Sequence, residues 1–295
     1  MKVGFVSILG LPNVGKSTLI NAILSKKVSI VTSKSQTTRD AIMGVYNEKD
    51  LQIVYIDTPG LFPGDEALYQ MMEKSARRSL SGVDAILYVI DSTSKNYAKD
   101  DETLASIKSD APIILLFNKI DDARVDQMEA LLAHYNEKFP SYEKIQISAK
   151  TNYGLKDIKN AIVAHLSEGL PFYPEEVITD KDETFMAKEV IREEILRFLK
   201  DEIPHECAVE ITSFEPLSGG YSLNATIVCE KEGQKAIIIG KGGEMVKKIS
   251  MAARHNLEKM WKKHVTLICR VECIPGWRND PRKLQKLGYG RKADN

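Results

Sequence analysis

The residue pattern with the clearest chemistry in this chain is a loop suited to hold phosphate groups. Its residues fit G-x-x-x-x-G-K-[ST] at every required position: Gly10, Leu11, Pro12, Asn13, Val14, Gly15, Lys16 and Ser17. The two glycines let the backbone turn its N–H groups toward a phosphate, Lys16 brings positive charge, and the Ser17 hydroxyl can ligate Mg²⁺. The pattern predicts a nucleoside triphosphate site, to which the next residue, Thr18, also contributes.

The neighbouring segments support this interpretation. Residues 3–9 form a short apolar run, as expected of a buried parallel strand, and residues 17–24 carry apolar side chains at helical spacing. A strand, a loop and a helix in this order direct a helix N-terminus at a phosphate.

A second motif predicts which base is bound. Asn118, Lys119 and Asp121 directly follow the apolar run 113–117. The two oxygens of Asp121 can accept the N1–H and N2–H₂ groups of guanine, a donor pair that adenine lacks. Asn118 can bridge loops, and the Lys119 stem can lie along the base. Guanine is therefore favoured, and an ATPase is disfavoured.

Two further strand ends complete the predicted nucleotide site. One carries Ser148, Ala149 and Lys150, of which Ala149 can offer its N–H to guanine O6. The other carries Asp57, Thr58, Pro59 and Gly60. We expect Asp57 to hold Mg²⁺ through water and the Gly60 N–H to meet the γ-phosphate, with a change of conformation when that phosphate leaves.

The first half of the chain alternates strand-like and helix-like segments. The strand-like segments 53–56, 85–90, 113–117 and 144–147 are each followed by a polar residue, and amphipathic stretches such as 66–80 and 126–138 lie between them. This rhythm predicts an α/β fold, a mostly parallel doubly wound sheet that binds ligands at the carboxyl ends of its strands.

The four motifs GLPNVGKS, DTPG, NKID and SAK resemble those of the translation-factor-related P-loop GTPases. The stretch 35–40, Ser-Gln-Thr-Thr-Arg-Asp, resembles the first switch region of that group. The resemblance implies that Thr38 ligates Mg²⁺ when GTP is bound, with Thr37 as the adjacent alternative. Ser17, Thr38 and Asp57 are thus the expected metal-binding residues.

One residue departs from the Ras-like pattern. Leu61 stands where Ras-like enzymes place a water-orienting glutamine, and leucine can neither orient nor activate water. Hydrolysis must then depend on Lys16, Mg²⁺ and loop amides such as that of Gly60. As a hypothesis drawn from the same resemblance, Asn13 helps to hold a K⁺ ion. The expected catalytic residues are Lys16, Thr38, Gly60 and Asn13.

A different pattern begins after a proline-containing stretch. We expect a GTP-binding domain over 1–168, a linker over 169–183, a second domain over 184–276 and a basic tail over 277–295. In the second domain we expect a helix at 185–199, strands at 207–214 and 223–230, helices from 240 towards 253 and at 256–263, and a strand at 265–273. The run 237–239 is expected to be strand.

The loop Gly240-Lys241-Gly242-Gly243, together with this order of elements, resembles the G-x-x-G loop of a type II KH domain, which clamps single-stranded RNA. Lys247 and Lys248 would add charge next to it. The apolar residues Ile238, Val246 and Ile249 fit either the floor of an RNA groove or the core.

Charge is divided unevenly along the chain. The formal net charge is zero, yet residues 240–295 contain 14 basic and 5 acidic residues. A polyanionic partner and a solvated basic tail both explain this charge. Trp277 and Tyr289 lie within the tail, near Arg278, Arg282 and Arg291, and either stack on bases or pack on the domain.

Several classes of protein are disfavoured. No run of eighteen apolar residues occurs, which argues against a transmembrane helix. A cleaved signal peptide would remove the first strand. The four cysteines lack zinc-finger spacing and are expected to be reduced, partly buried thiols.

A GTPase domain joined to a type II KH domain resembles the Era family of bacterial GTPases over nearly the whole chain. The resemblance implies a slow, cytoplasmic, monomeric GTPase that binds 16S rRNA near its 3′ end and assists assembly of the 30S subunit, with possible contact at the inner face of the membrane. The alternative is a GTP-sensing regulator of the cell cycle or metabolism that docks on a protein or the membrane.

Overall fold

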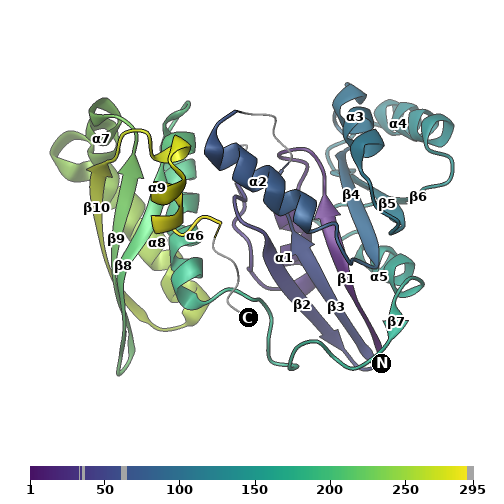
Figure 1. Ribbon diagram of the computed structural model, residues 1–295, viewed down its shortest axis with the longest axis horizontal. Helices are drawn as coiled ribbons and strands as arrows, with labels where there is room; N and C mark the ends of the chain where they lie inside the picture. Colours follow the sequence, from purple (N-terminus) through teal and green to yellow (C-terminus); the bar gives the residue numbers. More distant parts are fainter. Residues whose placement is uncertain (33, 35–36, 61–64, 291–295) are drawn as a thin grey trace. The chain divides into compact units, whose positions relative to one another are not determined.

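The computed structural model of the protein describes residues 1–32, 34, 37–60 and 65–290 (Figure 1). Within the described residues the chain divides into two compact units. The first comprises Met1–Ser29, Thr38–Pro63 and Met72–Asp180, and the second comprises Ile30–Thr37, Gly64–Met71 and Lys181–Asn295. Each unit therefore draws on stretches that are not contiguous in sequence.

The first unit contains a sheet with the strand order β2-β3-β1-β4-β5-β6. Its strands are β1 (Lys2–Leu9), β2 (Ile42–Glu48), β3 (Leu51–Asp57), β4 (Ala85–Asp91), β5 (Ile113–Asn118) and β6 (Glu143–Gln146). All neighbouring pairs on this path are parallel except β2 and β3, which are antiparallel. The predicted mostly parallel sheet is confirmed, and β2 is an addition that the sequence pattern did not indicate.

Helices cover both faces of this sheet (Figure 1). One core cluster joins the strands to α1 (Lys16–Leu24) and α5 (Leu155–Val163). A second cluster joins the other face to α3 (Ala98–Ser106) and α4 (Val125–Lys138). Because both faces are covered, the central strands are apolar along almost their whole length. The remaining helix, α2 (Ala67–Arg78), follows β3 in the chain.

The segment predicted as a linker belongs for the most part to the first unit, which extends to Asp180. Its β7 (Ser167–Glu168) pairs with β1, and Gly44 forms a bridge to Thr179. The buried Gln52 accepts hydrogen bonds from the N–H groups of Phe172 (2.7 Å) and Tyr173 (3.0 Å). This segment therefore satisfies its backbone groups on the sheet, and the first unit extends past residue 168 to Asp180.

The second unit is built on the three-stranded sheet β10-β9-β8. Its strands are β8 (Ala208–Leu217), β9 (Gly220–Cys229) and β10 (His264–Cys273), and its helices include α6 (Glu183–Phe198), α7 (Glu232–Ile239) and α8 (Glu244–Trp261). β8 and β9 are antiparallel, whereas β9 and β10 are parallel. One face of the sheet forms a core with α6, α7 and α8.

Two predicted elements of this unit are wrong. The run 237–239 ends helix α7 rather than forming a strand, and one helix, α8, replaces the two helices expected over 240–263. Three consecutive isoleucines fit a buried helix as well as a strand. Asn256, which we expected to begin a new helix, instead donates to Glu194 Oε1 at 2.8 Å.

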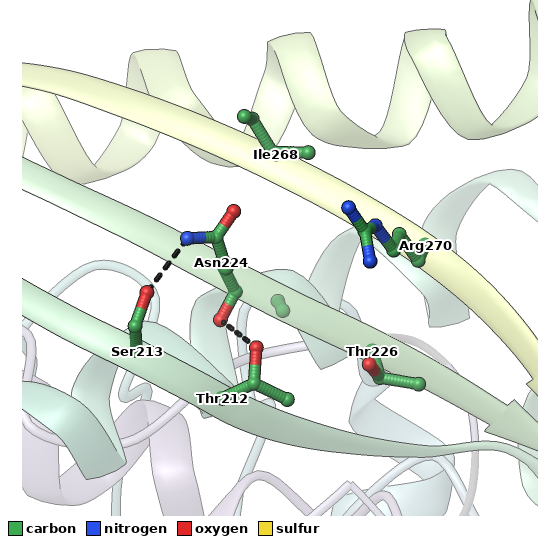
Figure 2. A pocket seen from close by; sticks show the side chains of 7 residues that line it. Thr212, Ser213, Asn224, Thr226, Ile268 and Arg270 are labelled. Carbon is green, nitrogen blue, oxygen red and sulfur yellow. Dashed lines mark hydrogen bonds between the residues drawn. The ribbon is translucent and has the colours of Figure 1, made fainter.

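The other face of this sheet carries mostly polar side chains (Figure 2). A β-bulge lies between Ile211 and Ser213. Thr212 Oγ1 donates to the Asn224 carbonyl at 3.1 Å, and Asn224 Nδ2 donates to Ser213 Oγ at 2.7 Å. These bonds join the bulged strand to its neighbour beside a shallow cavity of about 370 Å³ that is also lined by Arg270.

The tail packs on the second unit through η3 (Trp277–Asn279) and α9 (Pro281–Lys286). Trp277 and Tyr289 are both buried, with their rings stacked at a centroid distance of 6.1 Å. Trp277 Nε1 donates to the Glu206 carbonyl at 3.2 Å. Of the two alternatives for these aromatic residues, packing on the domain is the one that the structure shows. Arg291 lies outside the described residues.

The remaining expectations concern cysteines and membrane helices. All four cysteines have free thiols, with Cys207 and Cys229 buried and Cys269 and Cys273 partly buried. Among the described residues no helix is long and apolar enough to span a bilayer.

Candidate nucleotide and RNA sites

The phosphate loop connects β1 to α1 and requires its glycines. Gly10 and Gly15 have φ angles of 143° and 102°. A Cβ atom would lie 2.4 Å from the Val89 carbonyl oxygen at Gly10 and 2.3 Å from Asn118 Nδ2 at Gly15. Only glycine tolerates these φ angles together with such close neighbours, so both positions require it. With glycine there, the loop can turn its N–H groups toward a phosphate.

Lys16 lies folded over the loop. Its Nζ donates to the carbonyl oxygens of Gly10 (2.9 Å) and Leu11 (2.8 Å). Burial lowers the pKa of Lys16 to about 8, although the negative charge of Asp57 opposes this shift. A phosphate bound in the loop would give this ammonium group a negatively charged partner, which favours its charged form.

Three oxygen-bearing side chains meet at the carboxyl end of β3. Ser17 Oγ donates to Asp57 Oδ2 at 2.9 Å and lies 2.9 Å from Thr38 Oγ1, which is 3.5 Å from the same carboxylate oxygen. Asp57 Oδ1 is buried without a hydrogen-bond partner among the described residues. Burial raises the pKa of Asp57, and the nearby Lys16 opposes this shift. An all-oxygen donor set with a buried, unsatisfied carboxylate oxygen fits Mg²⁺.

The geometry distinguishes the two threonines of the first switch stretch. Thr37 Oγ1 donates to the Lys34 carbonyl at 2.8 Å and lies 2.9 Å from Thr32 Oγ1. Thr38 is therefore the threonine whose hydroxyl faces Ser17 and Asp57. The neighbouring Ser35 and Gln36 lie outside the described residues.

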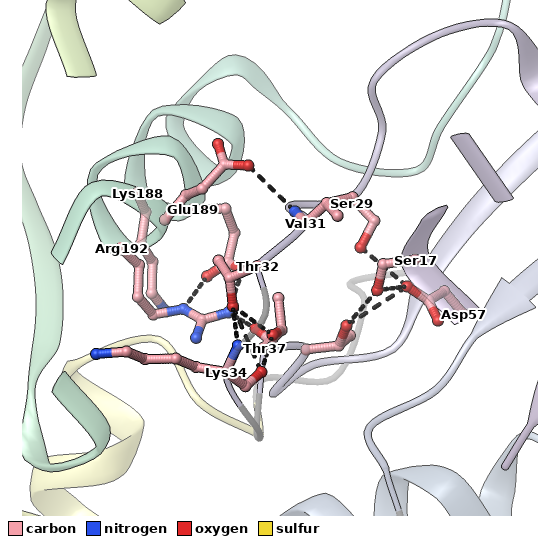
Figure 3. Close-up of polar contacts among 12 residues, drawn as sticks. Ser17, Ser29, Val31, Thr32, Lys34, Thr37, Asp57, Lys188, Glu189 and Arg192 are labelled. Carbon is pink, nitrogen blue, oxygen red and sulfur yellow. Dashed lines mark hydrogen bonds and ion pairs between the residues drawn. The ribbon is translucent and has the colours of Figure 1, made fainter. Parts of the chain in front are cut away.

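Ser29 is a residue of this site that the sequence did not indicate. Its Oγ donates to Asp57 Oδ2 at 2.9 Å (Figure 3). A serine in a loop after α1 carries no motif, and its contact with Asp57 spans 28 residues. Only the fold brings the two together.

The remainder of the Asp57 motif lies against the phosphate loop. Thr58 Oγ1 donates to the Ile8 carbonyl at 2.8 Å and so ties β3 to β1. A Cβ atom on Gly60 would lie 3.2 Å from Pro12 Cγ, so Gly60 closely approaches the loop. Leu61 lies outside the described residues.

Asn118 bridges two loops at the predicted base site. Its Nδ2 donates to the Val14 carbonyl at 2.8 Å, and its Oδ1 accepts the Ala149 N–H at 3.0 Å. The Ala149 N–H therefore already has a partner within the protein. A guanine O6 would have to share this N–H with Asn118.

Asp121 is oriented by its neighbours. Its Oδ1 accepts a hydrogen bond from Ser148 Oγ at 2.7 Å, and its Oδ2 lies 3.2 Å from Lys150 Nζ. The Ser148 hydrogen bond lowers the pKa of Asp121, with a contribution from Lys150, so the group is an ionised acceptor at neutral pH. Lys119 has a φ of 67° and forms an ion pair with Asp91 at 2.6 Å.

The G-x-x-G loop joins α7 to α8. Gly240, Gly242 and Gly243 have φ angles of 75°, 60° and 83°. Lys241 in this loop is exposed, as are Lys247 and Lys248 in the first turns of α8. Ile238 and Ile249 are fully buried in the core and Val246 packs against it, so the core interpretation holds for these apolar residues.

Comparisons with known proteins identify both halves of the chain. A family model described as 50S ribosome-binding GTPase matches residues 5–119, and a KH domain model matches residues 202–278. The GTPase Era of Clostridium acetobutylicum is 43% identical over 289 residues, which cover 98% of each chain. The chain belongs to the GTPase Era family. Era of Vibrio parahaemolyticus is 40% identical and aligns over 97% of this chain and 91% of that protein.

Solved Era structures have the same fold. A variant of Aquifex aeolicus Era bound to GDP·AlF₄⁻ is 35% identical, with a TM-score of 0.93 over 98% of this chain and 99% of that one. Era in complex with MgGDPNP and nucleotides 1506–1542 of 16S ribosomal RNA gives a TM-score of 0.94 at the same identity and coverage. This chain is thus an Era-family GTPase in which a P-loop GTPase domain precedes a KH domain.

Proposed function

We propose that this chain binds GTP with Mg²⁺, hydrolyses it slowly to GDP, and binds 16S rRNA near its 3′ end to assist assembly of the 30S subunit. The observation that carries the proposal is that one chain holds three motifs. These are the phosphate loop at 10–17, the loop at 118–121 that can read guanine, and the G-x-x-G loop at 240–243. A relative of 35% identity was solved with MgGDPNP and 16S rRNA nucleotides, which supports both ligands.

In this proposal the predicted nucleotide residues keep their roles. Gly10–Thr18 cradle the phosphates, Asp121 reads guanine, and Ser17, Thr38 and Asp57 hold the metal. When bound, Mg²⁺ would neutralise charge on the β- and γ-phosphates. Lys16 and the Gly60 N–H would stabilise the charge that develops during hydrolysis.

K⁺ is a further cofactor in the proposal, held with the help of Asn13. This residue is exposed in the phosphate loop and has a φ of 62°. Its amide oxygen is the atom that would ligate a monovalent cation. Replacing K⁺ by Na⁺ should then slow turnover, and an unchanged rate would remove K⁺ from the site.

The RNA site consists of Gly240, Lys241, Gly242 and Gly243 with Lys247 and Lys248. The glycines have positive φ angles and no side chains, so an RNA backbone can approach the loop closely. The N-terminus of α8 adds a dipole that favours a phosphate group. The net charge of +9 over residues 240–295 adds long-range attraction for a polyanion.

Gly242→Asp tests the RNA site. A Cβ at Gly242 would meet no atom within 4 Å, and aspartate tolerates the left-handed conformation better than most residues, so the unit should fold. We expect single-stranded RNA containing the 3′ end of 16S rRNA to bind at least about tenfold more weakly, since a negative charge would face the phosphates. Gly233→Asp, also in open space but at the first turn of α7, is the matched control.

Equal RNA affinity of the two variants would refute the KH site and favour the alternative of a GTP-sensing regulator that docks on a protein or the membrane. That alternative also predicts RNA binding that does not depend on salt or GTP.

We further propose that the protein acts as a cytoplasmic monomer, with any membrane contact peripheral.

A further inference from the structure

Asp91, the last residue of β4, is a charged residue at a strand end to which the proposed nucleotide site gives no role. β4 lies beside β5, and in their parallel register Asp91 is aligned with Asn118, the first residue of the motif proposed to bind guanine. The Ser92 N–H donates to the Asn118 carbonyl at 2.8 Å and so joins the two strand ends. Asp91 therefore lies directly beside the proposed base site.

The two oxygens of the Asp91 carboxylate have separate partners. Oδ1 accepts hydrogen bonds from the Thr93 N–H at 2.9 Å and from Thr93 Oγ1 at 2.7 Å. Oδ2 accepts from Lys119 Nζ at 2.6 Å. Because the bonds to Thr93 fix the orientation of the side chain, the second oxygen is held in a defined direction toward Lys119.

Lys119 is held at both ends of its side chain. Its backbone has a φ of 67°, in the left-handed region that residues with a Cβ seldom adopt, and its carbonyl accepts the Asp122 N–H at 3.0 Å. Its ammonium group is held by Asp91, so the four-carbon stem between these two points has few conformations left.

The ion pair itself contributes little to the stability of the fold. The lysine side chain is 32% exposed and the aspartate side chain 22%, and partly exposed pairs of this kind are screened by water. The main effect of the pair is therefore to order the Lys119 stem.

An ordered stem favours nucleotide binding. In the proposed site the stem lies along the guanine ring, while Asp121 accepts the N–H groups of the base. A lysine side chain that is disordered in the free protein loses rotamer freedom when it packs on a ligand, and this loss weakens binding. A side chain that is already ordered avoids most of that loss.

We infer that Asp91 is a positioning residue of the guanine site, which orders the Lys119 stem for contact with the base. The inference rests on the proposed function, because it takes Lys119 as a base-binding residue. All the residues that it uses belong to the first unit.

Asp91→Asn tests the inference. Asparagine can still accept both hydrogen bonds from Thr93, and these two donors hold the amide oxygen on their side. The amide nitrogen then faces the ammonium group of Lys119, and neither of the two can accept a hydrogen bond. The variant should fold, because it keeps the shape of the side chain and the bonds to Thr93.

For Asp91→Asn we expect the Kd for GDP to rise about fivefold, the scale of ordering one long side chain. KM for GTP should rise equally with kcat unchanged, since the base is bound alike in the ground state and the transition state. Inorganic tripolyphosphate, which has no base, should inhibit GTP hydrolysis as strongly as in the wild type. Asp91→Glu, which keeps a carboxylate, should fall between the wild type and Asp91→Asn.

Glu48→Gln is the matched control. Glu48 also pairs with a lysine of the first unit, Lys159 at 2.7 Å. It is aligned with Leu51, the first residue of β3, so it lies at the opposite end of the strands from Asp91. The Kd for GDP should be unchanged in this variant.

Lys119→Met separates positioning from a direct contact between Asp91 and the nucleotide. Methionine keeps an unbranched apolar stem but has no ammonium group for Asp91 to bind. In the Lys119→Met background, Asp91→Asn should raise the Kd for GDP no further, since both changes act on the same side chain.

The inference is overturned if Asp91→Asn binds GDP as tightly as the wild type, or if the effects of Asp91→Asn and Lys119→Met simply add. Inhibition by tripolyphosphate that weakens as much as GDP binding would also overturn it, because Asp91 would then support the whole edge of the sheet. Absence of GTP binding by the wild-type protein would instead refute the proposed function itself.

Discussion

In the proposed site a single side chain, that of Asp121, would determine which nucleotide is bound. Both of its oxygens are oriented, one by Ser148 and one by Lys150, so the carboxylate would meet a guanine as a fixed pair of acceptors. An amide in its place would offer one acceptor and one donor, which match xanthine rather than guanine.

Asp121→Asn should therefore reverse the preference between purine triphosphates. We expect the affinity for GTP to fall by about 100-fold or more and xanthosine triphosphate to become the better substrate. Competition between the two nucleotides for a fluorescent analogue measures this directly. Asp122→Asn, at an adjacent side chain that is 57% exposed, should leave the preference unchanged. If GTP remains preferred in Asp121→Asn, the base is read elsewhere.

A second residue-scale prediction concerns the buried Asp100 on α3. Burial raises its pKa to about 6, although the hydrogen bond from Tyr88 OH at 2.9 Å opposes the shift. The folded state then binds more protons than the unfolded state between the ordinary carboxyl pKa and this value. The contribution of Asp100 to stability consequently falls as pH rises through this window and is lowest above it.

Asp100→Asn removes that penalty and keeps an acceptor for Tyr88. We expect the free energy of unfolding in urea to rise by up to about 3 kcal/mol at pH 7.5, with a smaller gain at pH 4.5. The exposed Asp110, changed to Asn, should show no such pH dependence. A gain in Asp100→Asn that is equal at both pH values would mean that the ionisation of Asp100 does not limit stability.

The residues that sequence could predict are those whose roles depend on near neighbours in the chain. Gly10, Gly15 and Lys16 act within one loop, so their spacing alone carries their roles. Ser29 reaches the same site through a contact that forms only when the sheet brings Asp57 beside it. No local pattern marks such a residue.

Among the elements, the segment after β7 shows how a stretch that resembles a linker becomes part of a domain. Gln52, on β3, is 1% exposed and bonds to both the N–H and the carbonyl of Tyr173. One buried side chain thus replaces the strand partner that this segment would otherwise need.

Gln52→Leu should free the segment without removing much volume. The backbone groups of Phe172 and Tyr173 would lose their partners, at a cost of about 2 kcal/mol in the free energy of unfolding. Limited proteolysis should then cut between residues 169 and 180 faster than in the wild type. The matched control is Gln70→Leu, whose exposed side chain bonds only at 3.3 Å to the Asp65 carbonyl. Equal cleavage rates would show that other contacts hold the segment.

Strands of the first unit were predictable because both of their faces are buried, which leaves continuous apolar runs that end in polar residues of the proposed nucleotide site. Helix α7 could not be predicted, because Ile237, Ile238 and Ile239 fit a helix or a strand equally well. The exposure of Ile237, at 53%, is a consequence of the helical period.

At the scale of the whole molecule, the second unit is assembled from three separate stretches of chain. Arg278 illustrates this, because it lies 3.2 Å from Glu66 and from Glu206, and 3.5 Å from Glu230. The basic excess of residues 240–295 is thus partly neutralised by local carboxylates, while Lys241, Lys247 and Lys248, the cations of the proposed RNA site, are exposed. The composition revealed the excess of charge but not which of these cations are paired.

Residues 30–37 and 64–71 belong to the second unit, and this limits how the two domains can be exchanged between genes during evolution. Genes for two-domain proteins can exchange domains by a single crossover in the linker, provided that each domain carries its own core. A crossover near residue 181 would separate α6 from residues 30–37, where the Val31 N–H donates to Glu193 Oε1 at 3.1 Å and the Thr37 carbonyl accepts from Arg192 Nη2. The two halves of this chain should therefore descend together, with changes in one compensated by changes in the other.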